Sequence, residues 1–144
     1  MTTSIPGLDV LFIAGFGPIP QRVSDSQDFY QQTLGLPLKP MEGNSDYLVA
    51  DHDALTGAKH FALWPLDQAA ASCFGTSVWP DTHPVPQGWI EFEVDDLTSA
   101  TDILMKKGYQ LLVANRLEPW GQSVTRLLGP EGLLVGLTVT PWLR

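Results

Sequence analysis

The chain has 144 residues, of which 44% are apolar, and 16 acidic against 8 basic residues give it a formal net charge of −8. A chain of this size buries the core of one domain. The acidic balance, without a basic stripe, argues against nucleic acid as a partner. The lack of an apolar run of roughly 20 residues excludes a membrane-spanning helix, and the single Cys73 excludes an intrachain disulfide. We therefore expect one cytoplasmic domain with no membrane partner.

The first half of the sequence predicts a strand, a helix and three more strands. An apolar extended segment covers residues 8–19, and Ser24 with Gln27 forms a capping-box pattern that favours a helix start. Gly35 is typical of a helix end. Three strands follow, separated by Gly, Asn and Asp turns, near residues 38–42, 47–51 and 59–64. Two histidines in turns, His52 and His83, are expected to face solvent.

The second half repeats this order after a linking segment. Residues 67–74, rich in Ala, predict a short helix, and a proline-rich stretch after it predicts irregular structure. A strand over residues 89–94 precedes a helix that Asp96 caps and Gly108 ends. Three further strands are expected near residues 109–115, 123–128 and 133–140.

The landmarks of the two halves recur at a nearly constant interval. Gly35 and Gly108 are 73 residues apart, and Gly57 and Gly132 are 75 apart. Such an internal repeat indicates two copies of one supersecondary unit. We predict an α+β fold of two tandem βαβββ modules within a single domain, 1–144. The first module covers about 8–65, the link about 66–87 and the second module about 88–144.

Two strands of the second module show which face carries polar groups. Ile90, Phe92 and Val94 form an apolar face that would pack on helices. The opposite face is more polar, and so is one face of the last strand. Together these faces would line a concavity with Trp89, Glu91, Glu93, Gly136 and Thr138.

These landmarks resemble the vicinal oxygen chelate superfamily, which includes glyoxalase I, extradiol dioxygenases and the bleomycin-resistance proteins. The matching segments occur in the right order over nearly the whole chain, at residues 26–30, 34–37, 92–97, 118–122 and 129–132. The resemblance implies a cupped mixed sheet with helices on its outer face. It also implies a homodimer.

The resemblance further implies positions for metal ligands, one early in the first strand and one in the last strand of each module. In register, these positions fall on Gly15, Phe61, Trp89 and Gly136, none of which can bind a metal. A shift of one residue brings in His60, but one imidazole falls short of the three protein ligands of a catalytic zinc site. We therefore expect no divalent metal or other cofactor, and a structural role for His60.

Three functions remain open. The first is a metal-free protein that sequesters an aromatic or cationic ligand, such as an antibiotic, in a cup lined by Gly15, Trp89 and Trp120, as bleomycin-resistance proteins do. The second is a glyoxalase- or dioxygenase-type enzyme, a lyase, an isomerase or a ring-cleaving enzyme, with an unrecognised metal site or with Glu91 or Glu93 as general base. The third is a structural or regulatory domain with a collapsed cup. The first best accounts for the missing metal ligands.

Each candidate residue also has a structural interpretation. Trp89 would fill an unused cavity, and the two glutamates would reach solvent or pair with Arg116 or Arg126. Trp120, in a loop, would form a pocket wall or an exposed patch. Trp64 and Trp79, beside the linking helix, would lie in the core or at a dimer interface.

Overall fold

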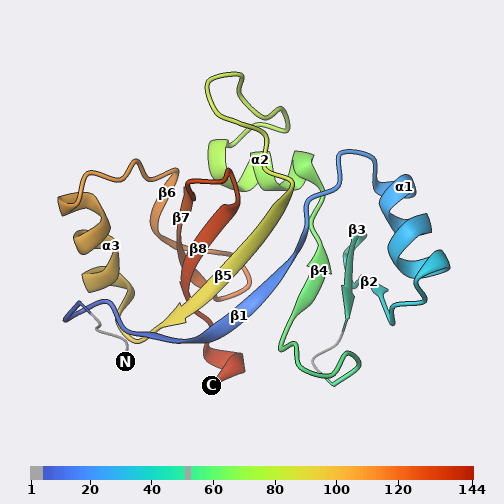
Figure 1. Cartoon of the computed structure of the whole chain (residues 1–144), viewed down its shortest axis with the longest axis horizontal. Helices are drawn as coiled ribbons and strands as arrows, with labels where there is room; N and C mark the ends of the chain where they lie inside the picture. The colour runs from blue at the N-terminus through green and yellow to red at the C-terminus, as the bar shows by residue number, and fades with distance from the viewer. Residues whose placement is uncertain (1–4, 51–52) are drawn as a thin grey trace. The chain divides into compact units, whose positions relative to one another are not determined.

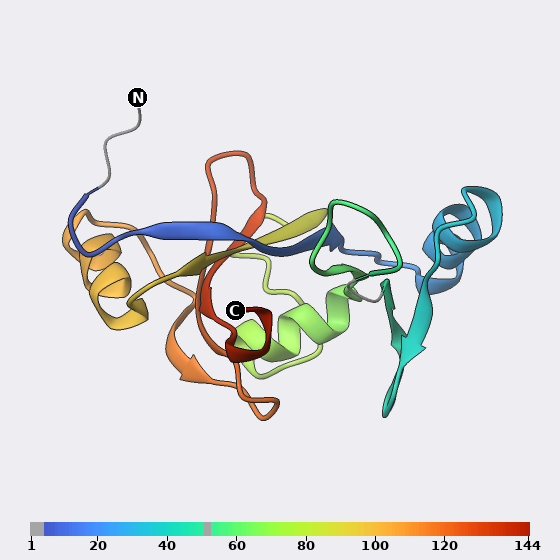
Figure 2. The same ribbon diagram turned by 90° about the horizontal axis from the view of Figure 1, so that it is seen from below.

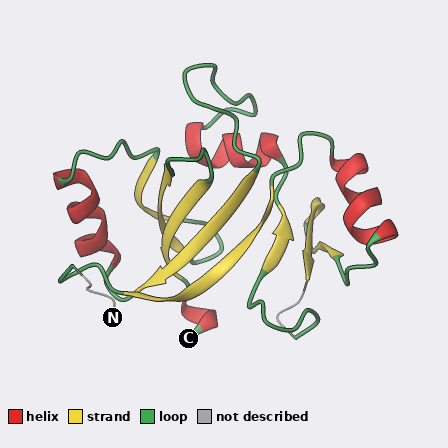
Figure 3. Cartoon of the chain, viewed as in Figure 1, coloured by secondary structure: helices red, strands yellow, loops and turns green. Residues whose placement is uncertain are grey.

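The computed structural model describes residues 5–50 and 53–144 (Figure 1). Its strands are β1 (Val10–Pro18), β2 (Lys39–Met41), β3 (Asn44–Ala50), β4 (Phe61–Leu63), β5 (Gly88–Val94), β6 (Val113–Leu117), β7 (Ser123–Leu128) and β8 (Leu134–Val139). Its helices are α1 (Val23–Gln27), the π-helical segment η1 (Asp28–Thr33), α2 (Leu66–Phe74), α3 (Leu97–Lys106) and the 3₁₀ turn η2 (Pro141–Leu143). The predicted α+β fold with a mixed sheet is confirmed (Figure 3).

The described chain divides into two compact units. The first unit comprises Gly15–Trp89, and the second comprises Ile90–Arg144 together with the residues up to Ala14. In this division the first part of β1 groups with the second half of the chain, and α2 groups with the first half. The sequence repeat groups each strand with the helix that follows it in the chain. The neighbours of that strand in the folded protein depend instead on tertiary packing.

The first unit contains the strand order β2-β3-β4-β1. β3 is antiparallel to both β2 and β4, and β1 is parallel to β4 with Phe16 opposite Phe61. The buried apolar cluster of this unit includes Leu48 and Leu63, and Tyr30 from the helical segment η1 packs against it. Burying such side chains is the main favourable term in folding this unit.

The second unit contains β5, β8, β7 and β6 as successive neighbours. β7 and β8 are antiparallel, with Val124 opposite Thr138 and Arg126 opposite Gly136. Phe92 and Val94 of β5 belong to the apolar cluster on which α3 packs. Figure 2 shows the segment before β1 passing beside α3, where a Cβ on Gly7 would meet Ile103 at 3.3 Å. The predicted apolar face of β5 is thus confirmed for Phe92 and Val94.

Several predicted boundaries are wrong. Helix α1 begins at Val23 after Arg22, which makes no side-chain cap, so the capping box at Ser24 does not form. The strand predicted from residue 109 begins only at Val113, because residues 109–112 form no regular ladder. His83 is half-buried, with its ring 5.3 Å from that of Phe74, rather than solvent-facing. Residues 51 and 52, which hold the end of one predicted strand and a predicted solvent-facing histidine, lie outside the described residues.

None of the helices in residues 5–50 and 53–144 is long and apolar enough to cross a membrane.

Candidate functional site

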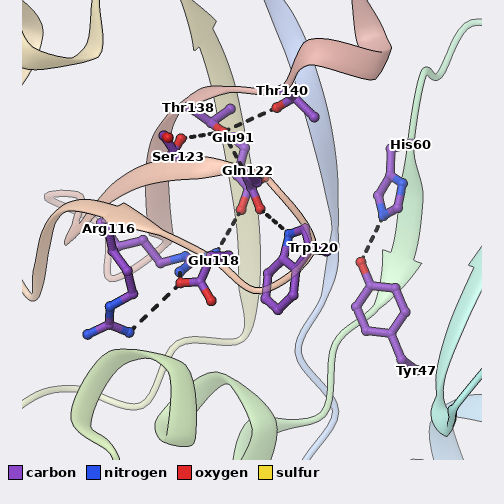
Figure 4. Close-up of polar contacts among 11 residues, drawn as sticks. Tyr47, His60, Glu91, Arg116, Glu118, Trp120, Gln122, Ser123, Thr138 and Thr140 are labelled. Carbon is purple, nitrogen blue, oxygen red and sulfur yellow. Dashed lines mark hydrogen bonds and ion pairs between the residues drawn. The ribbon is translucent and has the colours of Figure 1, made fainter.

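A polar cluster in the second unit surrounds the side chain of Gln122, just before β7 (Figure 4). Gln122 is buried, and its Nε2 donates to Glu91 Oε1 and to Thr138 Oγ1, each at 2.8 Å. We call Glu91, Glu118, Gln122, Arg126 and Thr138 the polar cluster. Its members come from β5, the loop before β7, β7 and β8, so the sheet register brings them together.

Arg126 pairs with both carboxylates of the polar cluster. Its side chain is 2% exposed, with Nη2 3.4 Å from Glu91 Oε2 and Nη1 3.3 Å from Glu118 Oε1. Arg116 adds a second guanidinium, 3.8 Å from the same Glu118 oxygen. A buried carboxylate needs such compensation because water no longer solvates it. Glu91 therefore pairs with Arg126 across the sheet, as its structural interpretation predicts.

Gly136 creates the space in which Glu91 lies. A Cβ on Gly136 would fall 2.9 Å from Glu91 Cγ, closer than real Cβ contacts allow. Gly136 also lies opposite Arg126 in the β7–β8 ladder. Because Gly136 has no side chain, the Glu91 carboxylate and the Arg126 guanidinium can approach each other across this face of the sheet. Thr138 is fully buried, and its hydroxyl donates to Ser123 O at 3.0 Å.

The loop between β6 and β7 holds Trp120 in a fixed but exposed position. The Glu118 N–H donates to Gln122 O at 2.7 Å, and the Gly121 N–H donates to Glu118 O at 2.9 Å. The turn requires the positive φ of Gly121, +95°, which favours glycine. The Trp120 indole N–H donates to Gln122 Oε1 at 2.8 Å, while the residue remains 54% exposed. The polar cluster thus anchors an exposed aromatic ring.

Glu93 lies on the same strand as Glu91 but outside the polar cluster. It is fully buried, and its Oε2 accepts from the Thr140 N–H at 2.7 Å and from Arg144 Nε at 2.8 Å. Its Oε1 has no hydrogen-bond partner among the described residues. Glu93 therefore ties the segment after β8 to β5.

The remaining predicted residues lie in the first unit. Trp89 is 4% exposed, and its indole N–H donates to Ala62 O at 3.2 Å. A Cβ on Gly15 would lie 3.0 Å from the Trp89 ring, so glycine makes room for the indole. The His60 and Trp64 rings pack against Trp89, each with its centroid 6.0 Å away. This geometry matches the cavity-filling interpretation of Trp89, and ligand contact by Trp89 stays a prediction.

The residues at the expected metal positions do not fit a divalent ion. Gly15 and Gly136 carry no side-chain donor atoms, and Trp89 fills the space in front of Gly15. His60 Nε2 lies 2.7 Å from the Tyr47 hydroxyl, so this nitrogen is already engaged in a hydrogen bond. Within residues 5–50 and 53–144, no three His, Cys, Asp or Glu residues lie close enough together to hold a metal ion.

Sequence reasoning did not single out Gln122 in this site or Trp142 near it. Gln122 belongs to a segment that resembles the family, and its alternation with Val124 and Arg126 of β7 is the signal that places it on the same side of the chain as those two residues. Trp142, which is 57% exposed, belongs to no sequence motif that would indicate a functional role. A Cβ on Gly121 would lie 3.8 Å from its Cζ3 atom. Only the fold brings Trp142 beside the Trp120 loop.

Comparison with known proteins identifies the class. The family model described as Glyoxalase/Bleomycin resistance protein/Dioxygenase superfamily matches residues 19–137. The chain therefore belongs to the glyoxalase/bleomycin resistance protein/dioxygenase superfamily. A comparison with curated proteins finds no match.

Solved structures share the fold at low sequence identity. A superfamily member from Vibrio splendidus 12B01 is 13% identical with a TM-score of 0.56, and the match covers 92% of this chain and 99% of that one. A methylmalonyl-CoA epimerase in complex with methylmalonyl-CoA and NH4+ is 20% identical with a TM-score of 0.57, covering 94% and 99%. The Mycobacterium tuberculosis methylmalonyl-CoA epimerase is 17% identical with a TM-score of 0.56, covering 93% and 91%. At these identities the likeness shows the fold alone.

Proposed function

We propose that this chain is a small-molecule-binding protein that works without a metal, like the bleomycin-resistance proteins of its superfamily, and that its ligand stacks on Trp120. The observation that carries the proposal is a half-exposed indole whose N–H is held by the buried Gln122. A ring fixed in this way loses little conformational entropy when a ligand binds.

The same ring sets the class of ligand. A Trp side chain presents about 150–250 Å² of surface, and its electron-rich face attracts flat aromatic groups and cations. The chain's net charge of −8 favours the approach of a cation over an anion. The proposed ligand is therefore a planar aromatic molecule, with a positive charge as the favoured form.

The polar cluster supports binding better than acid–base chemistry. A general base must reach a substrate proton within hydrogen-bond distance. Both oxygens of Glu91 are already engaged, Oε1 by Gln122 and Oε2 by Arg126. The cluster thus positions Trp120 without offering a free base.

One observation favours a second candidate, a structural or regulatory domain that binds no small molecule. Trp89 is almost fully buried and its N–H is satisfied by Ala62 O, as expected for packing rather than ligand contact. This candidate predicts that no planar aromatic compound binds, so the same experiment separates the two.

The experiment measures the affinity of 1-methylquinolinium and of neutral quinoline by ligand-observed NMR. Wild-type protein should bind the cation more tightly. Trp120→Ala should weaken its affinity at least about tenfold, as expected for a central aromatic anchor, and Tyr109→Ala should leave it unchanged because that exposed residue (54%) lies outside the Trp120 loop. Equal affinity in wild type and Trp120→Ala would rule out the site. No binding of either compound would support the structural candidate.

A further inference from the structure

A second half-exposed indole borders the turn that carries Trp120. Trp142 lies in η2 and is 57% exposed. A Cβ placed on Gly121, the residue after Trp120, would lie 3.8 Å from Trp142 Cζ3. The Trp142 ring therefore lies against the turn that carries Trp120. Each indole leaves about half of its surface open, although Trp is among the side chains that gain most from burial.

The position of Trp142 is fixed by Glu93. The residues on either side of η2 both bond the same buried oxygen, since the Thr140 N–H and Arg144 Nε donate to Glu93 Oε2. The Arg144 guanidinium also donates to Val94 O. Within the turn, the Leu143 N–H donates to Thr140 O at 3.0 Å. The segment that carries Trp142 is thus pinned to β5 at both ends.

This anchor is costly for a surface turn. Glu93 is fully buried, so its carboxylate loses its hydration on folding. The pairing with Arg144 must offset that desolvation cost. An apolar residue at position 93 would fill the space without that cost. The arrangement is explained if the placement of Trp142 matters for binding.

We propose that Trp142 is a second ligand contact beside Trp120 and that Glu93 is the residue that positions it. The proposed second contact narrows the ligand class to planar molecules of at least two fused rings, whose larger face can be shared between Trp120 and a neighbour of its turn. This inference rests on the proposed function and adds a size requirement to it.

The test compares the two-ring probe 1-methylquinolinium with the one-ring probe 1-methylpyridinium by ligand-observed NMR. Trp142→Ala should weaken the affinity for the two-ring probe about tenfold and leave the affinity for the one-ring probe unchanged. Trp142→Phe should retain most of the affinity, because it restores an aromatic face. The role of Trp142 is overturned if Trp142→Ala leaves the affinity ratio of the two probes as in wild type.

The positioning role of Glu93 has its own readout. Glu93→Gln removes the charge that holds Arg144 and should shift the same probe ratio toward that of Trp142→Ala, whereas a loss of packing alone would leave the ratio unchanged. Should Glu93→Gln not fold, Arg144→Gln breaks the same ion pair from its more exposed side, and Arg144→Lys should restore the wild-type ratio. An unchanged ratio in Arg144→Gln overturns the role.

The Trp120 site and the Trp142 contact are separated by different combinations of variant and probe. If Trp120→Ala weakens both probes and Trp142→Ala changes neither, the Trp120 site stands and the second contact is wrong. If Trp120→Ala leaves both probes unchanged, the proposed function itself fails, whatever Trp142→Ala does. Circular dichroism of each variant confirms that it is folded before its affinity is interpreted.

Discussion

Arg126 is the residue on which the polar cluster depends for its charge balance. It is nearly inaccessible to solvent and contacts carboxylates from two different parts of the second unit. Glu118 is 6% exposed, so without Arg126 its charge would depend on the more distant Arg116, at 3.8 Å. The cost of an unpaired buried charge is far larger than the gain from a surface ion pair.

We predict that Arg126→Ala lowers the free energy of unfolding by about 3–5 kcal/mol, because it leaves two carboxylates without their shared partner. Urea denaturation followed by fluorescence measures the change. The control is Arg22→Ala, which breaks a solvent-exposed pair with Asp25 (3.8 Å) and should have almost no effect. Equal stability losses in the two variants would show that the buried pairing is not structurally important.

For single residues, the sequence predicts which face of a strand a side chain lies on better than it predicts how deeply that side chain is buried. Alternation along β5 correctly places Glu91 on the face opposite the apolar cluster. It does not predict the burial of Trp89, which depends on Gly15 lying beneath the ring. That contact joins residues far apart in the sequence, and a glycine carries no side chain whose pattern would reveal it.

Helix α3 illustrates an element that local chemistry determines. Asp96 caps it, as predicted, with Oδ1 accepting from the Ser99 N–H at 3.1 Å and Oδ2 accepting from the Ser99 hydroxyl at 3.0 Å. These bonds, the backbone one foremost, lower the pKa of the Asp96 carboxyl below its ordinary 3.8. Helix α1 lacks such a cap and continues into a π-helical segment. Its start could not be predicted because the Ser24 pattern is present but unused.

We predict that Asp96→Ala lowers the melting temperature at neutral pH and that the difference from wild type shrinks on acidification. A carboxyl whose pKa is lowered by folding stabilises the protein fully above its unfolded pKa, near 3.8, and loses this contribution as the pH falls through the folded pKa. Thermal melts between about pH 7 and about pH 2.5 measure the effect.

The matched control for the cap is Ser24→Ala. Ser24 offers the same kind of capping side chain, but α1 begins at Val23 with no side-chain cap. Its melting temperature should equal that of wild type at every pH. A difference between wild type and Asp96→Ala that stays constant down to the lowest pH would contradict the role assigned to the ionised cap.

For the whole molecule, the fold class was predictable because the repeat is a property of the entire sequence. The spacing of Gly35 and Gly108 does not depend on any single contact, and both residues adopt the positive φ expected after a helix, +70° and +88°. The grouping of residues up to Ala14 with the second half was not predictable, since it depends on which strands pair in the folded chain.

We propose that a second copy of the chain covers the exposed apolar residues of β1. Leu11 and Ile13 lie on one side of this strand and are each about half exposed. Light scattering of the wild-type protein should give twice the 15.8 kDa mass of one chain. The double variant Leu11→Lys/Ile13→Lys should give the mass of one chain. The control Val85→Lys changes an exposed apolar residue in the first unit and should leave the dimer intact. A wild-type mass of one chain would refute the homodimer.

The affinity of 1-methylquinolinium for the protein before and after exhaustive treatment with EDTA is the most direct test of metal-independent binding at Trp120. We predict dissociation constants within about twofold of each other in the two preparations, and an affinity at least about tenfold weaker in Trp120→Ala under both conditions. Loss of binding on chelation, with recovery on adding back a divalent metal, would contradict the account.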